Sequence, residues 1–536
     1  MAQEAHSGTS ADEARLEPTA SKVIRRFRSF RYSLVVEGIV VGVLAGMVTV
    51  LFRLALEQAD TILYHILDFG KQNRWFIPIW LVVLAAVSLL VTLLLKWEPL
   101  ISGSGIPQVE GEMQGRIKQC WWRVLLAKFV GGLLTIGSGL SLGREGPSIQ
   151  LGAMAGKGVA RLSHRNRTEE KLLITCGASA GLSAAFNAPF AGVLFSLEEI
   201  HKTFSVEVLL STMTASITAD FISRNVFGLR PIFSFQIQQM MPLHTYGLVI
   251  LFGILLGLLG VLYNYCIGWS QKLYDRIKWR WVRGLMPFML AGMIGFIFPK
   301  ILGGGHALVG EINTGQITVY MLLILLAAKF LFSMISFGSG VPGGIFLPLL
   351  VLGAISGAAF SGGATLLFGT DRSLLQNFVI LGMAGLFSAI VRAPITGTIL
   401  ICEMTGSFSH LLTLSLVSLT AYIVADLLKS KPVYDALLRR LLASRPRQKT
   451  DPTGEKILVE TSIVHGAAAE GCRVGKVCWP QACLVISILR GEDELVPNGE
   501  TIICAGDRIT VLCDESVAPD VHEVLEKECR RVTKPM

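Results

Sequence analysis

The sequence contains little charge for its length. Asp, Glu, Lys and Arg together make up 16% of the 536 residues, whereas hydrophobic residues make up 52%. A typical soluble domain carries about 25% charged residues. The low charge and the high apolar content therefore exclude an ordinary soluble globular protein and indicate a polytopic membrane protein.

Patterns that catalysis requires are also missing from the sequence. There is no GxxxxGK nucleotide-binding loop, and no Ser/His/Asp set stands apart from the motifs described below. Of the ten cysteines, Cys472, Cys478 and Cys483 lie too far apart for a CxxC pair, and no histidine follows them at zinc spacing. These absences argue against an enzyme and predict neither a metal nor a cofactor.

Basic residues outnumber acidic ones, with a formal charge of +9, but they cluster beside apolar stretches. This arrangement favours positive-inside membrane topology over a nucleic-acid partner. It places both termini in the cytoplasm; a nuclear localisation signal is the alternative for the first run. The first 20 residues are polar and acidic, so no cleavable signal peptide is expected. The run before the first apolar span, about 34–56, consists of Lys22, Arg25, Arg26, Arg28 and Arg31.

Two glycine-rich stretches of the chain match one another. GSGLSLGREGPSIQLGAMAG at 137–156 aligns without a gap with GSGVPGGIFLPLLVLGAISG at 338–357. A second pair begins at Ala180 (AGLSAAFNAPFAGVLFSLEE) and at Ala384 (AGLFSAIVRAPITGTILICEM). The chain is therefore a duplication with interrupted apolar segments at matching places. That pattern predicts a membrane transporter whose site lies between the repeats.

The glycines and the proline of these stretches interrupt helices, and each stretch leads into a new helix. Backbone N–H groups at a helix start, together with the helix dipole, form an anion site. Glu145 aligns with Phe346, and Arg144 aligns with Ile345, so the duplicated scaffold requires no charge there. This favours a functional role for Glu145; the alternative is a buried glutamate paired with Arg144.

Three motifs, GSGIP at 103–107, GREGP at 143–147 and GGIFLP at 343–348, resemble the anion-site motifs of the CLC family of chloride channels and chloride/proton exchangers, in the same order. KPVYDALL, which contains Tyr434, and GGGHALVGE at 303–311 fit the same family. The resemblance covers about residues 30–440. It implies an all-α polytopic membrane protein with an inverted internal repeat, the CLC fold, that forms a homodimer.

The resemblance implies a chloride site made of the Ser104 and Tyr434 hydroxyls and the amides of Ile345 and Phe346. Such donors suit a dehydrated chloride, because a full fixed cation would hold it too tightly for release. An interfacial belt tyrosine is the alternative for Tyr434. The backbone of the site is expected to comprise Gly103, Gly105, Ile106, Pro107, Gly143, Arg144, Gly146, Pro147, Gly343 and Gly344.

Two glutamates carry the proton-coupling prediction. By resemblance, Glu145 is the gate and the external proton acceptor, and Glu199 is the internal proton-transfer site. Glu198 aligns with Glu403 in the other half, which indicates a structural pair, whereas Glu199 aligns with Met404. The alternative for Glu199 is a helix-end charge. Two other family-like polar positions, Glu110 and Lys128, are expected to pair with one another or to tune Glu199, and His201 and His306 are interpreted as structural.

After about Lys449 the chain changes character. ILVETSIV, ACLVISILR and DRITVLC predict strands, and VAPDVHEVLEKECRR predicts a final helix. The segment resembles the TrkA-C subdomain of potassium-conductance regulators. That subdomain usually dimerises, and in relatives it binds a small regulatory ligand such as a cyclic dinucleotide. We therefore expect a small α+β cytoplasmic domain.

The sequence predicts a chloride/proton antiporter, multi-pass in a bacterial cell membrane and regulated by the TrkA-C-like domain. A passive gated chloride channel, a nitrate or fluoride variant and a receptor with an inert membrane part are the alternatives. Chloride, protons and membrane lipid are the expected partners, and nucleic acid is not. The predicted domains are a basic N-terminus at 1–30, a transmembrane domain at 31–445 with repeats of about 31–240 and 241–445, a linker at 446–456 and the regulatory domain at 457–536.

Overall fold

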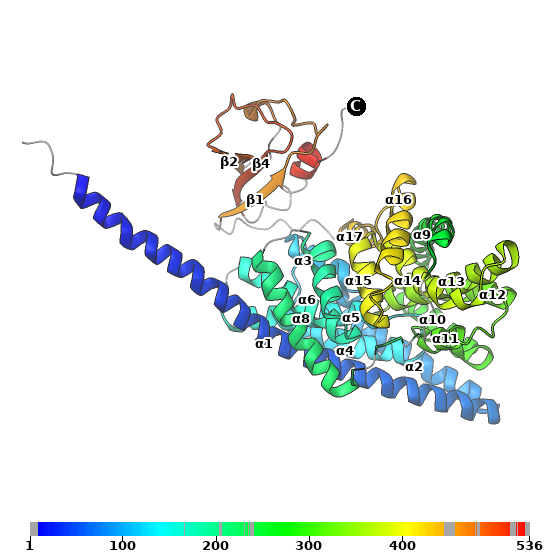
Figure 1. The fold of residues 1–536 in the computed structure, drawn as a ribbon. Coiled ribbons are helices and arrows are strands. Elements are labelled where there is room, and N and C mark those ends of the chain that lie inside the picture. Colours follow the sequence, from blue (N-terminus) through cyan, green and yellow to red (C-terminus); the bar gives the residue numbers. More distant parts are fainter. Residues whose placement is uncertain are drawn as a thin grey trace, which may run out of the picture. The chain divides into compact units, whose positions relative to one another are not determined.

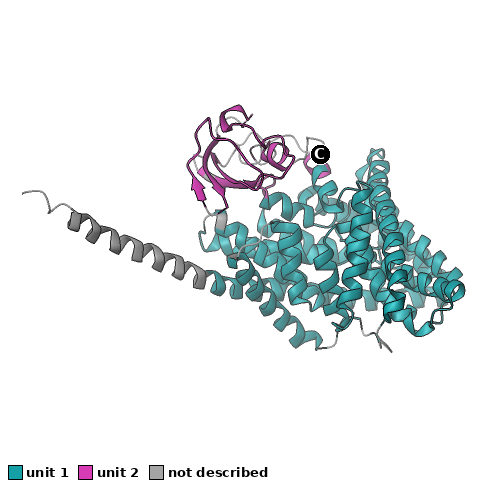
Figure 2. Cartoon of the chain, turned by 45° about the horizontal axis from the view of Figure 1, so that its top comes forward, with its two compact units in different colours: residues 1–113, 119–439 teal, residues 114–118, 440–536 magenta. Residues whose placement is uncertain are grey.

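The computed structural model divides the chain into two compact units (Figure 2). The membrane unit comprises Met1–Met113 and Gln119–Arg439, and the C-terminal unit comprises Gln114–Lys118 and Arg440–Met536. The described residues are 9–165, 167–202, 206–229, 231–233, 235, 241–443, 456–477, 479, 483–491, 493–514, 521 and 524–530. The predicted N-terminal segment, 1–30, precedes the first described side chain, Leu34, and most of the predicted linker lies outside the described residues.

The membrane unit repeats one order of helices twice (Figure 1). The first half contains α1 (Thr9–Gln72), α2 (Phe76–Trp97), η1 (Pro99–Ile101), α3 (Ile106–Met113), α4 (Trp121–Gly137), α5 (Glu145–Leu162), α6 (Arg167–Phe186), α7 (Pro189–Phe195), η2 (Ser196–His201) and α8 (Val206–Phe227). The second half contains η3 (Leu243–Thr245), α9 (Tyr246–Asp275), α10 (Arg280–Ile297), η4 (Pro299–Ile301), α11 (His306–Ile312), α12 (Val319–Gly338), α13 (Phe346–Phe368), η5 (Arg372–Leu374), α14 (Leu375–Val391), α15 (Pro394–Thr405) and α16 (Leu411–Leu427), and α17 (Val433–Ala443) follows.

Six of the described helices are long and apolar enough to cross a membrane. They are Leu34–Gln72, Phe76–Trp97, Leu243–Asp275, Val319–Gly338, Phe346–Phe368 and Arg372–Val391. The first helix continues well beyond the apolar span expected at about 34–56, and it packs along α8, α6 and α5 (Figure 1). The prediction of an all-α polytopic membrane protein is confirmed.

Glycines bring paired helices into close contact in both halves. A Cβ atom at Gly152 of α5 would lie 2.1 Å from the carbonyl oxygen of Gly177 of α6. In the second half, a Cβ atom at Gly353 of α13 would lie 2.3 Å from the carbonyl oxygen of Gly382 of α14. Small residues let helix backbones approach closely where lipid supplies no hydrophobic driving force. The high glycine content of the chain therefore serves helix packing as well as helix interruption.

Buried lysines hold the helix-breaking loops in the same way in each half. Lys128 of α4 donates to the carbonyl oxygens of Ile101 and Gly103, at 2.8 and 2.6 Å. Lys329 of α12 donates to those of Ile301 and Gly303, both at 2.7 Å. The expected pairing of Lys128 with Glu110 is wrong, because the ammonium group of Lys128 instead satisfies these two carbonyl groups.

The C-terminal unit contains a four-stranded antiparallel sheet in the order β1-β4-β2-β3. Its strands are β1 (Lys456–Ser462), β2 (Cys483–Arg490), β3 (Asp493–Leu495) and β4 (Arg508–Asp514). A separate apolar core lies beneath it, with Ile488, Ile509 and Val511 fully buried. Three strands were predicted from the sequence, whereas the short β3 was not. Part of the predicted final helix lies outside the described residues, and the described part includes η8 (Glu526–Arg530).

Candidate functional site

Two of the three anion-site motifs are joined directly by their backbones. Gly143 donates to the carbonyl oxygen of Gly344 at 2.7 Å, and Gly344 donates to that of Gly143 at 2.8 Å. α5 begins at Glu145 and α13 at Phe346, each directly after this bridge. The N-termini of a first-half helix and a second-half helix are therefore held close together. The first turn of each helix presents N–H groups that have no partner within the helix itself.

The third motif is fixed to the same place by further backbone hydrogen bonds. The Gly343 N–H donates to the carbonyl oxygen of Gly103 at 3.0 Å, and the Gly103 N–H donates to that of Gly340 at 3.3 Å. Gly103 and Gly105 have φ values of 62° and 97°, which glycine adopts without strain. α3 begins just after them, so the motif adds a third helix start to the cluster.

The carboxylate of Glu145 occupies a position that suits an anion. Its side chain is fully buried, and Oε2 accepts from the Leu347 N–H in the first turn of α13, at 3.4 Å. Oε1 has no hydrogen-bond partner among the described residues. A Cβ atom at Gly143 would lie 2.1 Å from Oε2, so glycine at 143 leaves the space that the carboxylate fills.

Two buried hydroxyl groups lie in the same region without partners. The Ser104 Oγ and the Tyr434 hydroxyl form no hydrogen bond within the described residues. A Cβ atom at Gly146 would lie 2.4 Å from the Ser104 Oγ, which places the serine at the start of α5. Buried polar groups are normally paired, and an unpaired one costs about 1–3 kcal/mol unless water or a ligand satisfies it. The arrangement fits a small anion that accepts from these donors.

Aromatic rings form much of the surroundings of Tyr434 and α13. The ring of Phe195 contacts the rings of Tyr434 and Phe346 edge-on, with centroids 6.4 and 6.2 Å apart. Phe346 also packs against Phe186 and Phe387. Ile345, Phe346 and Tyr434 are all fully buried. An interfacial belt position for Tyr434 is therefore wrong, because such residues are exposed to lipid headgroups.

Arg144 occupies the N-cap position of α5, and its side chain forms no cap hydrogen bond there. Its ion pair is with Glu57 of α1, with 3.8 Å between Nη1 and Oε1. No ion pair between Arg144 and Glu145 is formed within the described residues. The alternative reading of Glu145 as the buried partner of Arg144 is thus not what the structure contains.

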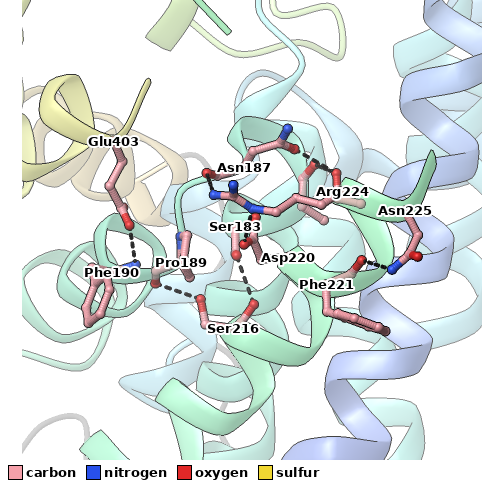
Figure 3. Close-up of polar contacts among 12 residues, drawn as sticks. Ser183, Asn187, Pro189, Phe190, Ser216, Asp220, Phe221, Arg224, Asn225 and Glu403 are labelled. Carbon is pink, nitrogen blue, oxygen red and sulfur yellow. Dashed lines mark hydrogen bonds and ion pairs between the residues drawn. The ribbon is translucent and has the colours of Figure 1, made fainter. Parts of the chain in front are cut away.

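Glu198 and Glu403 each cap a helix of the opposite half. Glu198 Oε2 accepts from the N–H and the Oγ1 of Thr396, at 2.9 and 2.7 Å, in the first turn of α15. Glu403 accepts from the N–H groups of Phe190 and Ala191, at 3.1 and 2.8 Å, at the start of α7; the first bond is drawn in Figure 3. This reciprocal arrangement agrees with the interpretation of the two glutamates as a structural pair.

Glu199, on η2, is buried next to a cluster of charges. One of its carboxylate oxygens has no hydrogen-bond partner among the described residues. Close to it, Lys202 Nζ donates to Glu110 Oε1 at 2.6 Å and to Asp435 Oδ1 at 2.9 Å. Tyr434, the residue before Asp435, interacts electrostatically with both Glu145 and Glu199. Tyr434 is therefore within electrostatic range of both glutamates of the proton-coupling prediction.

Some residues of the site were not predicted from the sequence. The Leu347 amide was missed, although every N–H in the first turn of a helix lacks a partner within the helix and could have been included. Lys202 and Asp435 were also missed, although Asp435 lies inside the KPVYDALL motif and Lys202 lies three residues after Glu199. His201 and His306 have local contacts: His201 Nδ1 lies 3.2 Å from the Thr175 Oγ1, and His306 stacks on Phe233, at 4.7 Å between ring centroids.

Comparisons with known proteins agree on one family. The family "Voltage gated chloride channel" matches residues 86–426, and the TrkA-C domain matches residues 458–525. The H(+)/Cl(-) exchange transporter ClcA of Vibrio cholerae serotype O1 (strain M66-2) is 35% identical over 436 residues, which cover 78% of this chain and 92% of the relative. The protein of the same name from Yersinia pestis is 34% identical, with 79% and 91% covered.

Solved structures give the same result. A slow cyanobacterial Cl⁻/H⁺ antiporter has a TM-score of 0.74 and 31% identity, covering 77% of this chain and 98% of that one. A eukaryotic CLC transporter, at 22% identity and a TM-score of 0.65 with 79% and 78% covered, shares the fold. The chain therefore belongs to the CLC family of voltage-gated chloride channels and chloride/proton exchangers, and it carries a C-terminal TrkA-C domain.

Proposed function

We propose that the chain is a chloride/proton antiporter of the cell membrane. The matched family is a transporter family and not an enzyme family, and the similar proteins are named H(+)/Cl(-) exchange transporters. The observation that carries the proposal is the position of Glu145. Its carboxylate lies at the start of α13, in a region that also contains two unpartnered hydroxyl groups, so it competes with chloride for the same donors.

Chloride binds between the helix starts in this mechanism. The Ser104 and Tyr434 hydroxyls and the amides of Ile345 and Phe346 donate to it, and the Leu347 amide, which donates to Glu145 in the structure, becomes available when the carboxylate leaves. None of these donors carries a full charge, so the ion can be released. Protonation removes the charge of Glu145, and the neutral side chain loses its attraction to the helix N-termini.

Proton exchange on the predicted cytoplasmic side is assigned to Glu199. A buried carboxyl group with a free oxygen can take up and release a proton, and Tyr434 lies within electrostatic range of both glutamates. Coupling follows because chloride entry displaces Glu145 and thereby favours its protonation. The family assembles as dimers, and we include a homodimer with both termini cytoplasmic in the proposal.

The test uses the full-length protein in liposomes with a chloride gradient and no pH gradient. The membrane potential is clamped with a potassium ionophore. We expect chloride to drive protons uphill, and Glu199→Gln to abolish proton movement while chloride flux continues. Glu198→Gln is the matched control, because it changes the adjacent charge and keeps an acceptor for Thr396. Chloride movement without protons in the parent protein would identify a passive channel instead.

Regulation by the C-terminal unit is part of the same proposal. The TrkA-C match covers residues 458–525, and the resemblance to this type of domain implies a small regulatory ligand. We expect cyclic di-AMP to change the chloride flux of the full-length protein. Unchanged flux, with no binding by calorimetry, would remove this ligand from the proposal and leave the exchange mechanism intact.

A further inference from the structure

Lys202 joins three separate parts of the membrane unit. It directly follows η2, which carries Glu199, and its ammonium group contacts Glu110 of α3 and Asp435 of α17. The side chain of Glu110 is 1% exposed and that of Asp435 is 32% exposed, so the bridge extends from a buried carboxylate toward the surface. Lys202 lies 92 positions from Glu110 and 233 from Asp435 in the chain. The contact is therefore a long-range one that fixes how these segments meet.

The backbone of Lys202 is held in an uncommon conformation. Its φ of 57° lies in the left-handed region, where a lysine is less favourable than a glycine. The Lys202 N–H closes the turn by donating to the carbonyl oxygen of Leu197 at 3.0 Å. A strained backbone conformation of this kind persists only where contacts with the surrounding structure hold the residue in place. Here the two ionic contacts of the side chain are the interactions that a glycine would not provide.

Charges of both signs surround Glu199. Lys202 supplies positive charge, whereas Glu110, Asp435 and Glu198 supply negative charge. Other titratable groups near η2 also have contacts: Glu112 of α3 pairs with Lys157. His201, the last residue of η2, interacts with Thr175 and Lys171 of α6, and Tyr434 lies on α17.

We propose that Lys202 is a positioning residue for proton transfer: its ammonium group sets the proton affinity of Glu199 and ties the Tyr434 end of α17 to the Glu199 segment. This inference rests on the proposed exchange function and adds a residue to it. A positive charge near a carboxyl group favours the ionised form, and a neighbouring carboxylate disfavours it. Lys202 and Asp435 thus act on Glu199 in opposite directions.

Electrostatics predicts the direction in which each substitution changes the pH at which Glu199 binds a proton. Without the ammonium group, Glu199 loses the nearby positive charge but keeps the negative charges of Glu110 and Asp435 close by, so it binds a proton at higher pH. Without the Asp435 charge, Lys202 acts on Glu199 with less competition, and the proton is released at lower pH. A charge a few ångströms away in a partly buried site shifts such an equilibrium by about one pH unit or more.

The experiment measures chloride-driven proton transport by the full-length protein in liposomes, from about pH 4 to about pH 8. We expect Lys202→Gln to move the half-maximal pH of proton transport up by about one unit. Lys202→Arg should restore the parent profile, and Asp435→Asn should move it down. Lys300→Gln is the matched control, because it removes a lysine from another 2.6 Å ion pair, with Glu311, and should leave the profile unchanged.

Opposite shifts in the two variants support the electrostatic role. Coinciding profiles of Lys202→Gln and the parent, or shifts of both variants in one direction, would overturn it. Should Lys202→Gln not fold, the direction of the Asp435→Asn shift decides the question. A parent protein that moves chloride and no protons contradicts the proposed function itself, which distinguishes the two failures.

Discussion

The hydroxyl groups of Ser104 and Tyr434 have no hydrogen-bond partner within the described residues, whereas the Ser148 hydroxyl in the first turn of α5 donates to the carbonyl oxygen of Arg144. Removing such a group deletes a donor for the ion and leaves no protein atom newly unpaired. We predict that Ser104→Ala weakens chloride binding by about tenfold, the effect of one hydrogen bond to an anion. Isothermal titration calorimetry with chloride measures this change.

Thermal stability without chloride should stay at the parent value in Ser104→Ala. Ser356→Ala is the matched control, since Ser356 is a buried serine of α13 whose Oγ donates to Leu352 of its own helix, at 2.8 Å. Chloride affinity should be unchanged in this control. Equal affinity of the parent and Ser104→Ala would exclude the hydroxyl from the ion site.

Among individual residues, the sequence predicted those that lie inside the short helix-breaking motifs. Ser104 and Glu145 belong to GSGIP and GREGP, where a short stretch carries both the helix break and the side chain. Lys202 and Asp435 could not be predicted in this way, because their contact depends on how α3, η2 and α17 meet in space. A charged residue in or near a motif is usually solvated, and the sequence alone does not distinguish a solvated charge from one that forms a long-range ion pair.

Helix pairs depend on glycines at points of backbone contact. In α13, a Cβ atom at Gly353 would lie 2.3 Å from the Gly382 carbonyl oxygen, whereas one at Gly363 would meet no atom within 4 Å. We predict that Gly353→Ala forces α13 and α14 apart and abolishes stable folding. Gly363→Ala, in the same helix, should be neutral or slightly stabilising. Size-exclusion chromatography and thermal unfolding in detergent distinguish the two variants. Equal behaviour of Gly353→Ala and Gly363→Ala would contradict the close backbone contact between α13 and α14.

The two halves are connected by reciprocal helix caps, in which Glu198 caps α15 and Glu403 caps α7. Removing the carboxylate in Glu403→Ala leaves the N–H groups of Phe190 and Ala191 without their acceptor. We predict a loss of about 1–2 kcal/mol in stability, typical of a lost N-cap. Glu403→Gln should retain much of it, because an amide oxygen still accepts. A thermal midpoint of Glu403→Ala equal to the parent value would show that the cap contributes nothing.

The internal repeat allowed two pairs of matching helix starts to be predicted, because matching stretches are expected to form matching helices. The end of the first helix was harder to predict. Glu57 and Asp60 end the apolar stretch, yet the helix continues to Gln72, and Glu57 pairs with Arg144 and Arg53. In the C-terminal unit, the three-residue strand Asp493–Leu495 gives too short an alternation to be recognised.

The whole chain combines two compact units, each with its own buried core. In the C-terminal unit, Arg490 donates twice to Asp507, at 2.9 and 2.8 Å, and the Cys504 N–H also donates to this carboxylate at 2.8 Å. Burial raises the pKa of Asp507, but these hydrogen bonds outweigh it and hold the pKa below its usual value. The ionised carboxylate therefore stabilises the folded unit above the ordinary aspartate pKa of about 3.9.

This stabilisation should be lost as the pH falls below about 4 toward the lowered pKa of the folded state. We predict that calorimetry of the full-length protein shows the C-terminal transition moving to lower temperature over this range. Asp507→Asn should destabilise that transition by about 1–3 kcal/mol at neutral pH and weaken its acid dependence. An unchanged acid dependence in the variant would assign the effect to other groups.

The reciprocal helix caps also bear on how the chain is synthesised. Ala191 and Phe190 leave the ribosome 212 and 213 residues before the glutamate that caps them. At a translation rate of about 5–20 residues per second, the start of α7 waits roughly 10–40 s for its partner. During that interval the first half is in the membrane with an unfinished helix end and an unpaired Gly143 loop. These groups cannot form the hydrogen bonds of the folded protein until the second half arrives, so the two halves must complete their folding together although they are made one after the other.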